Sequence, residues 1–337
     1  MEEKKNVRLE NILISNHQTD SLFSDVYIEH NSFPEMDFSE IDTSVEFFGK
    51  KVPFPMIINA ITGGTEQGVE INEILYTISK ELNIPMEIGN QDIIFEDEKS
   101  IELFLGEHAS ETRETVMLAN LHASSSLEDV KKAIESIKAD GIALHINPAQ
   151  EIIGPDGRRD FRGILDNIKA INEVYPDRLI IKEIGSGMSR KTVESIISTG
   201  VNMIDVSGLG GSNLIEIENL RNVDRDFSDL YDWGIPTAKS ILDARAASKD
   251  LKIIASGGIK TSVDLVKALI LGADYVGIGG ELLKFLLHGG HEYAKAYLEE
   301  LIYKTKVLMF LLGVKNIEEL KRVPYQLTGK LKELYHE

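Results

Sequence analysis

The chain has 337 residues, of which 42% are hydrophobic and 27% charged, an ordinary globular composition that suits one large α/β domain or two medium ones. It contains no cysteine, so disulfides and thiolate metal sites are excluded, and any metal must be held by histidine or oxygen ligands. The net charge of -19 argues against generic nucleic-acid binding and against diffuse attraction to an anionic membrane.

The first 50 residues are polar and irregular, and we expect them to form an N-terminal extension or lid. Lys4, Lys5 and Arg8 make a small basic group there, which by itself is typical of a solvated helix start. No apolar core of a secretory signal follows Met1, and the most apolar stretch, 307–312, is too short to span a bilayer. These features predict a cytoplasmic protein without a membrane partner.

From residue 56 onward, apolar strands alternate with helical segments. We expect strands at 56–61, 85–88, 116–119, 141–146, 179–183, 203–206, 252–255 and 275–278. Helical spacing and capping residues predict helices at 71–82, 126–137, 161–173, 189–199, 238–247, from 261 onward, and at 294–312. Strict alternation implies a parallel sheet, and eight such units predict one α/β domain over 1–337, a (β/α)8 TIM barrel. A doubly wound open sheet is the second choice, because no glycine-rich dinucleotide fingerprint follows the first strand.

The predicted strand at 141–146 ends in a dense polar cluster. His145, Asn147, Gln150 and Glu151 lie within seven residues, and Pro148 stops the strand ladder because it has no N–H to donate. In an α/β barrel the carboxyl ends of the strands form the catalytic face. A polar loop after a core strand is the alternative interpretation of this stretch taken alone.

Glycine pairs follow the last two predicted strands, Gly257-Gly258 and Gly279-Gly280. Glycine lets backbone N–H groups approach an anion closely, and the helix that Thr261 caps adds its positive end. In barrels this is the usual phosphate site. The pattern therefore predicts a phosphate cradle, with tight turns alone as the alternative.

Polar groups also end other strands. Amides and hydroxyls at Asn59, Asn120 and Ser207 can hydrogen-bond a planar heterocycle. Lys182 ends an apolar strand, where its charge requires an anion or an electron-rich cofactor; a salt bridge to a carboxylate on a neighbouring strand is the alternative. Lys182 and Glu183 must point to opposite faces of the strand. Together these groups outline a pocket for flavin mononucleotide (FMN).

Several stretches resemble the type 2 isopentenyl-diphosphate isomerases. They are Asn59-Ala60-Ile61-Thr62-Gly63-Gly64, His145-x-Asn147-x-x-Gln150-Glu151, Lys182-Glu183-Ile184-Gly185-x-Gly187-Met188, Ser207-Gly208-x-Gly210-Gly211-Ser212-Asn213, Glu216-x-Glu218-Asn219, Trp233-Gly234 and Ser256-Gly257-Gly258. The resemblance implies a barrel that isomerises isopentenyl diphosphate to dimethylallyl diphosphate in isoprenoid biosynthesis, with reduced FMN as the acid–base catalyst. It also implies Mg²⁺ for the diphosphate, NADPH or NADH as reductant, and a homo-oligomer of four or eight subunits.

The same resemblance implies a role for each residue. Gln150 would orient the substrate or flavin and relay a proton, and Glu151 would hold Mg²⁺. His145 and Asn147 would contact the diphosphate, and His145 would also take part in catalysis. The N-terminal group Lys4, Lys5 and Arg8 would clamp the diphosphate. FMN would be held by Ala60, Thr62, Gly63, Asn90, Asn120, Lys182, Ser207, Ser212, Gly257, Gly258, Gly279 and Gly280.

Three positions depart from the family pattern. Lys4-Lys5-Asn6-Val7-Arg8 stands where the family has Arg-Lys-x-x-His, Asn90 stands where serine is usual, and Asp92 stands where others carry a neutral or basic side chain. The first change keeps positive charge, whereas the other two add bulk and negative charge near the cofactor or the diphosphate. An FMN-dependent oxidoreductase of the same barrel, or a flavin-binding paralogue without activity, are therefore the alternative functions.

Overall fold

A computed structural model describes residues 15–95, 101–106, 108, 115–155, 157–222 and 224–335. Lys4, Lys5 and Arg8, the predicted diphosphate clamp, lie outside these described residues. Among the described helices, none is both long and apolar enough to cross a membrane.

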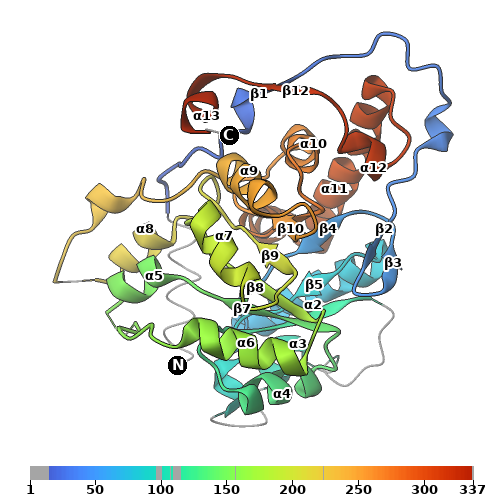
Figure 1. Ribbon diagram of the computed structural model, residues 1–337. Helices are drawn as coiled ribbons and strands as arrows, with labels where there is room; N and C mark the ends of the chain where they lie inside the picture. The colour runs from blue at the N-terminus through green and yellow to red at the C-terminus, as the bar shows by residue number, and fades with distance from the viewer. Residues whose placement is uncertain are drawn as a thin grey trace.

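Eight parallel strands close into a barrel in chain order, which confirms the predicted TIM barrel (Figure 1). They are β4 (Met56–Ile58), β5 (Met86–Glu87), β6 (Met117–His122), β7 (Gly141–His145), β8 (Leu179–Lys182), β9 (Met203–Asp205), β10 (Lys252–Ala255) and β11 (Tyr275–Ile278). The first strand is shorter than expected, because it ends at Ile58 and not at Ile61. The glycine-rich chain after it leaves the sheet to form part of the barrel mouth.

Helices follow the strands and cover the barrel. They are α2 (Glu66–Leu82), α4 (Leu127–Ser136), α6 (Ile164–Val174), α7 (Arg190–Ile197), α9 (Thr237–Ala247), α10 (Ser262–Ile270) and α11 (Gly280–Leu312). The caps read from the sequence are present: Ser126 and Thr261 each form a capping box with the aspartate three residues on, and Ser189 caps α7. Helix α11 begins earlier than predicted, bends at Gly289 and Gly290, and ends at Gly313 with φ 70°.

The barrel lumen is apolar at one end and polar at the other. Ile57, Leu118, Ala143, Ile180 and Ile254 belong to a buried cluster inside the barrel. Because side chains alternate along a strand, the residue two positions further faces the same lumen one layer higher. Those residues are Asn59, Asn120, His145, Lys182 and Ser256, all of them buried. The sequence thus builds an apolar floor beneath a polar layer at the carboxyl ends of the strands.

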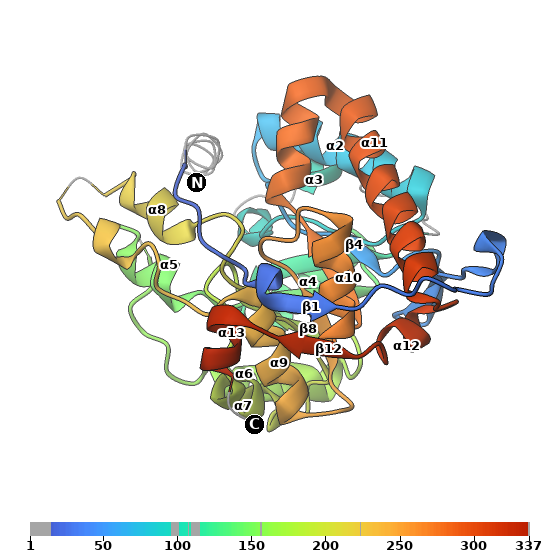
Figure 2. The same ribbon diagram turned by 90° about the horizontal axis from the view of Figure 1, so that it is seen from above.

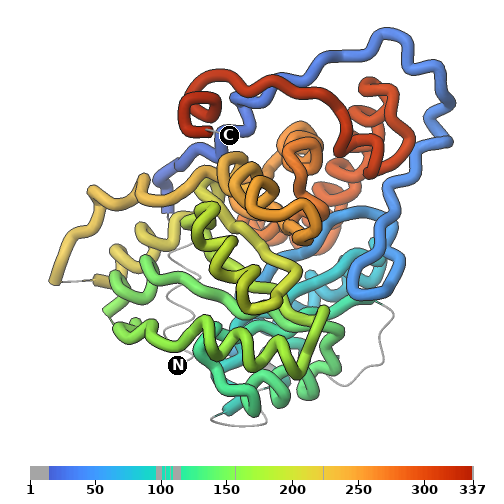
Figure 3. Tube along the Cα trace, viewed as in Figure 1, coloured from blue at the N-terminus to red at the C-terminus, as the bar shows by residue number. Residues whose placement is uncertain are grey.

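The N-terminal segment is more regular than the sequence suggested. The hairpin β2 (Val45–Phe47) and β3 (Lys50–Val52) places Phe47 and Val52 in the cluster that forms the apolar floor. Strand β1 (Val26–Ile28) pairs with β12 (Tyr325–Leu327) near the other end of the chain, as Figures 2 and 3 show. Much of residues 15–44 is irregular, as expected, but the short strands were not predicted because they find partners only in the folded chain.

The remaining short elements lie in the connections. They are α3 (Glu102–Leu105), α5 (Pro148–Ile153), α8 (Leu214–Asn219), α12 (Ile317–Leu320), α13 (Gly329–Leu334) and the 3-10 turns Phe23–Asp25, Phe38–Glu40, Asp92–Phe95 and Ser228–Leu230. Two of them matter for the site. Helices α5 and α8, which were not predicted from the sequence, pack against each other beside the barrel mouth (Figure 2).

Candidate active site

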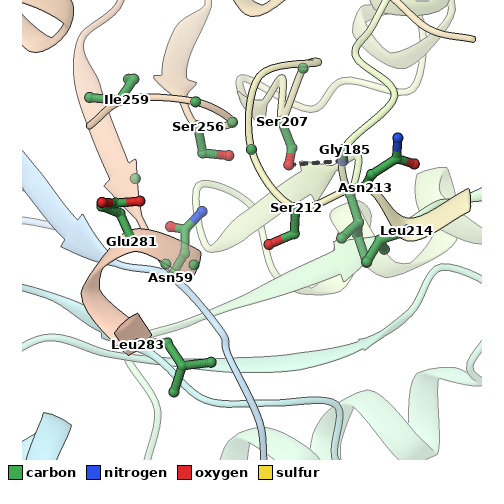
Figure 4. A pocket seen from close by; sticks show the side chains of 18 of the residues that line it. Asn59, Gly185, Ser207, Ser212, Asn213, Leu214, Ser256, Ile259, Glu281 and Leu283 are labelled. Carbon is green, nitrogen blue, oxygen red and sulfur yellow. Dashed lines mark hydrogen bonds between the residues drawn. The ribbon is translucent and has the colours of Figure 1, made fainter. Parts of the chain in front are cut away.

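A cavity of about 310 Å³ opens at the carboxyl ends of the strands, over β8 to β11 and β4. Figure 4 shows Asn59, Ser207, Ser212 and Ser256 turned toward this space. The hydroxyl of Ser207 accepts a hydrogen bond of 3.2 Å from the backbone N–H of Gly185. The lining is rich in glycine and hydroxyl groups and therefore offers hydrogen bonds more than apolar contact.

The cavity brings together most of the residues predicted to bind FMN. Those that line it are Ala60, Lys182, Ser207, Ser212, Gly257, Gly258, Gly279 and Gly280. Four others do not line it. Thr62 accepts a hydrogen bond from Asn72 through its carbonyl, Gly63 packs near Phe104, Asn90 bonds Asp92, and Asn120 lies in the polar layer.

At three of the four glycines of the cradle, Gly257, Gly258 and Gly280, a side chain would collide with neighbouring atoms. Gly257 has φ +92°, and a Cβ there would lie 2.1 Å from the carbonyl oxygen of Gly208. A Cβ on Gly280 would lie 2.7 Å from Ser212 Oγ. Helix α11 begins at Gly280, so its positive end faces the cavity, and Lys260 and Lys284 also line the wall. Backbone donors, a helix end and two lysines suit the phosphate of FMN.

Two carboxylates and one lysine lie buried at the centre of the polar layer. Lys182 Nζ forms an ion pair with Asp205 Oδ2 and lies 3.6 Å from Glu87 Oε2. Burial alone would lower the pKa of Lys182, but Asp205 and then Glu87 raise it. Burial raises the pKa of Glu87, which Lys182 only partly opposes. Lys182 is therefore held by Asp205 and Glu87, and the pKa of Glu87 stays raised because burial outweighs the attraction of Lys182.

The rest of the layer completes this network. Asn59 Nδ2 donates to Asp205 Oδ2 at 3.0 Å, and Ser256 Oγ donates to Asp205 Oδ1. Asn120 Nδ2 donates to Glu87, and its Oδ1 lies 2.9 Å from His145 Nδ1. The neighbouring-strand salt bridge considered for Lys182 is thus present, and the same lysine also lines the cavity.

Glu87 and Asp205 were not assigned to the site from the sequence. Each lies in a short apolar strand, Met86-Glu87-Ile88 and Ile204-Asp205-Val206. Their strand neighbours pack outward against the helices, so alternation turns the charged residue into the lumen. A single charge between two apolar residues of a barrel strand was the available signal.

The chain after β7 forms a second polar group. Asn147 caps α5 by accepting from the N–H of Gln150 at 2.9 Å, and its Nδ2 donates to the carbonyl of Ile184. Gln150 Nε2 donates to Glu218 Oε1 at 2.9 Å, which ties α5 to α8. Glu151 accepts from the N–H of Arg158. The sequence offered no partner for Gln150, because Glu218 is 68 positions away.

These two groups lie on opposite walls of the barrel. In the closed order, β10 lies four strands from β6 in either direction, and β11 lies four strands from β7. The glycine cradle follows β10 and β11, whereas the His145 to Glu151 cluster follows β7. The mouth therefore offers two separate polar regions, with the polar layer between them.

Residues 15 to 21 run across the glycine side of the mouth. Glu216 accepts hydrogen bonds from Ser15 Oγ and from the backbone N–H of Asn16 at 3.1 Å. Thr19 Oγ1 accepts from the N–H of Gly210 at 2.7 Å. Through these contacts the N-terminal segment reaches the cavity that Ser15 helps to line.

Comparisons with known proteins agree with this geometry. The family model for FMN-dependent dehydrogenases matches residues 162–326. The chain is 37% identical to an isopentenyl-diphosphate delta-isomerase of Geobacillus sp. over 97% of this chain and 93% of that protein. It is 36% identical to the enzyme of that name from Thermococcus kodakarensis, over 92% of this chain and 87% of that protein. A mandelate oxidase variant with a monooxide FMN adduct shares the fold, with a TM-score of 0.66 at 14% identity over 95% of this chain and 92% of that one.

Proposed function

Because this chain belongs to the family of the type 2 isopentenyl-diphosphate delta-isomerases, we propose that it converts isopentenyl diphosphate to dimethylallyl diphosphate in isoprenoid biosynthesis. The observation that carries the proposal is the identity of more than a third over nearly the full length of the relatives. The two polar regions on opposite walls support it, because FMN and a diphosphate substrate each need a place at the barrel mouth.

FMN fits the glycine side of the mouth. Gly257, Gly258, Gly279 and Gly280 hold its phosphate, and Ser207 and Ser212 supply further hydrogen bonds from the cavity wall. When bound and reduced, FMN supplies a group that exchanges protons with a carbon of the substrate. The Lys182–Asp205 ion pair belongs to the buried polar layer beneath this cavity.

The substrate occupies the side of β7. His145 and Asn147 contact the diphosphate, and Gln150 orients the alkene and relays a proton, held in place by Glu218. Moving a double bond adds a proton at one carbon and removes one at another, and acids this weak need positioned groups and excluded water. We further propose that Lys4, Lys5 and Arg8, which lie outside the described residues, bind the diphosphate through their positive charge.

Mg²⁺ is proposed at Glu151. Among the described residues, no three histidine, aspartate or glutamate side chains lie close enough to form a metal site by themselves. Glu151 would supply one carboxylate, and Mg²⁺ takes one or two carboxylates together with phosphate oxygens and water. We further propose NADPH or NADH as the reductant, a single domain over the whole chain, a cytoplasmic location, and a homo-oligomer of four or eight subunits.

A hydride-transferring FMN enzyme is the second candidate, favoured by the match to the FMN-dependent dehydrogenase model. One experiment separates the two. The purified protein is examined for flavin absorbance and then assayed with isopentenyl diphosphate, Mg²⁺ and a catalytic amount of NADPH. Isomerase activity yields many turnovers per NADPH oxidised, whereas stoichiometric NADPH consumption would assign an oxidoreductase. Bound flavin without turnover would leave only a binding role.

A further inference from the structure

The histidine that ends β6 carries a buried nitrogen without a hydrogen-bond partner. His122 is 4% exposed, and its Nε2 has no partner within the part of the chain that the structure describes. Buried polar atoms in native proteins are nearly always satisfied, so such an atom indicates a missing ligand or water. His122 Nε2 is thus a place where a ligand group or a water molecule can bind.

The contacts of the other ring nitrogen, Nδ1, decide whether Nε2 is a hydrogen-bond donor or an acceptor. The backbone N–H of Ser124 donates to His122 Nδ1 at 3.1 Å, and the hydroxyl of Ser124 lies 2.8 Å from the same atom. A backbone N–H can only donate, so Nδ1 is an acceptor and the neutral ring carries its proton on Nε2. Burial, followed by Arg158, lowers the pKa of His122 and so favours the neutral ring. Nε2–H is then a donor that suits an anionic oxygen and cannot bind a metal ion.

This donor lies on the side of the barrel mouth where the substrate diphosphate is proposed to bind. By strand alternation His122 faces the lumen together with Asn120, one layer higher. It pairs in register with His145 on β7, and the two rings meet edge to face with centroids 5.3 Å apart. Arg158, Glu151 and Asp92 are the charged groups that act on it. His122 is therefore next to the cluster proposed to hold the substrate.

We propose that His122 is a further substrate-binding residue, whose Nε2–H donates a hydrogen bond to a diphosphate oxygen. The inference rests on the proposed function, because it takes the substrate diphosphate as the acceptor. A neutral donor adds affinity for the anion without adding net positive charge beside Glu151 and Asp92.

The test measures pyrophosphate binding to the FMN-loaded enzyme in the presence of Mg²⁺ by calorimetry. His122→Phe keeps a ring but removes the donor, and His122→Gln keeps an N–H close to the position of Nε2. We expect His122→Phe to weaken binding roughly tenfold or more, because the lost hydrogen bond is to a charged group. His122→Gln should stay close to the parent. In turnover, His122→Phe should raise KM for isopentenyl diphosphate with little change in kcat.

A matched control is His288→Phe, which changes an exposed histidine on α11. Circular dichroism and retained flavin absorbance check that each variant is folded. If His122→Phe does not fold, the ring ¹⁵N–¹H spectrum of the parent decides. The His122 Nε2–H resonance should move when pyrophosphate is added, and an unmoved resonance overturns the proposal.

The outcomes distinguish this inference from the proposed function. Equal pyrophosphate affinity in the parent and His122→Phe would mean that water or another group satisfies Nε2, and the inference fails. If pyrophosphate binding depends on His122 but the parent does not turn over isopentenyl diphosphate, the proposed function fails and the anion donor stands.

Discussion

A buried carboxyl outside the lumen makes the stability of this protein depend on pH. Glu183 follows Lys182 but faces the loop after β8, where its Oε2 accepts from the N–H of Ser186 at 2.7 Å. Burial raises the pKa of Glu183 from 4.5 to about 8, although the N–H groups of Ser186, Ile184 and Gly187 oppose the rise. The folded state therefore binds a proton that the unfolded state releases at neutral pH.

The sign and size of the effect follow from this difference. Since the folded pKa lies above the unfolded value, the stabilisation is fully present below pH 4.5 and is lost as the pH rises through about 8. At about 1.4 kcal/mol per pH unit, the upper limit is roughly 5 kcal/mol of unfolding free energy. Glu183→Gln keeps an acceptor for Ser186 but cannot ionise, so it should remove this loss.

The assay is urea unfolding of the parent and of Glu183→Gln from pH 5 to pH 9 at constant FMN. The variant should match the parent near pH 5 and become the more stable protein toward pH 9. Glu194→Gln on α7 is the control, because Glu194 is about half exposed in its pair with Arg190. It should follow the parent at every pH. A constant difference between the parent and Glu183→Gln across this range would refute the reasoning.

Three further predictions concern the site. Gly279→Asp should abolish flavin retention, because its carboxylate would repel the phosphate. Gly279→Ala should remain yellow, because a Cβ there meets nothing closer than 3.7 Å. A colourless Gly279→Ala protein would show that packing, and not charge, is responsible. Gln150→Ala should keep FMN but lose turnover, and Glu151→Gln should weaken the Mg²⁺-dependent activity. Rates close to those of the parent at saturating Mg²⁺ would contradict the roles proposed for these two residues. Deleting residues 1–8 should leave a yellow, folded protein with a strongly raised KM, and an unchanged KM would show that the basic group is merely solvated.

The fold could be predicted from the sequence because its signals are local. Apolar runs of strand length, helical spacing and caps such as Ser126 and Thr261 depend on residues within a few positions of one another. Eight strand–helix units can form only a few kinds of parallel sheet, and the closed barrel is the one that they form. The glycine cradle was visible for the same reason, since Gly257 and Gly258 both adopt positive φ in the turn after β10.

Tertiary structure decided which residues contact one another. Lys182 forms its ion pair with Asp205 only because β8 and β9 align these two residues, and Glu87 joins them across the barrel. The hairpin that carries Phe47 closes the apolar floor, although nothing in its own sequence indicates a barrel. Barrel closure also sets the glycine cradle opposite the β7 cluster.

The sequence by itself therefore determined which chemical groups stand at the strand ends, since strand period and turn composition are properties of short stretches. Only the closed barrel decided which of them meet and which remain unpaired, such as Gln150 with Glu218 and the free Nε2–H of His122 among the described residues. The physical reason is that register, shear and burial join residues far apart in the chain, and their energies depend on contacts that no local pattern contains.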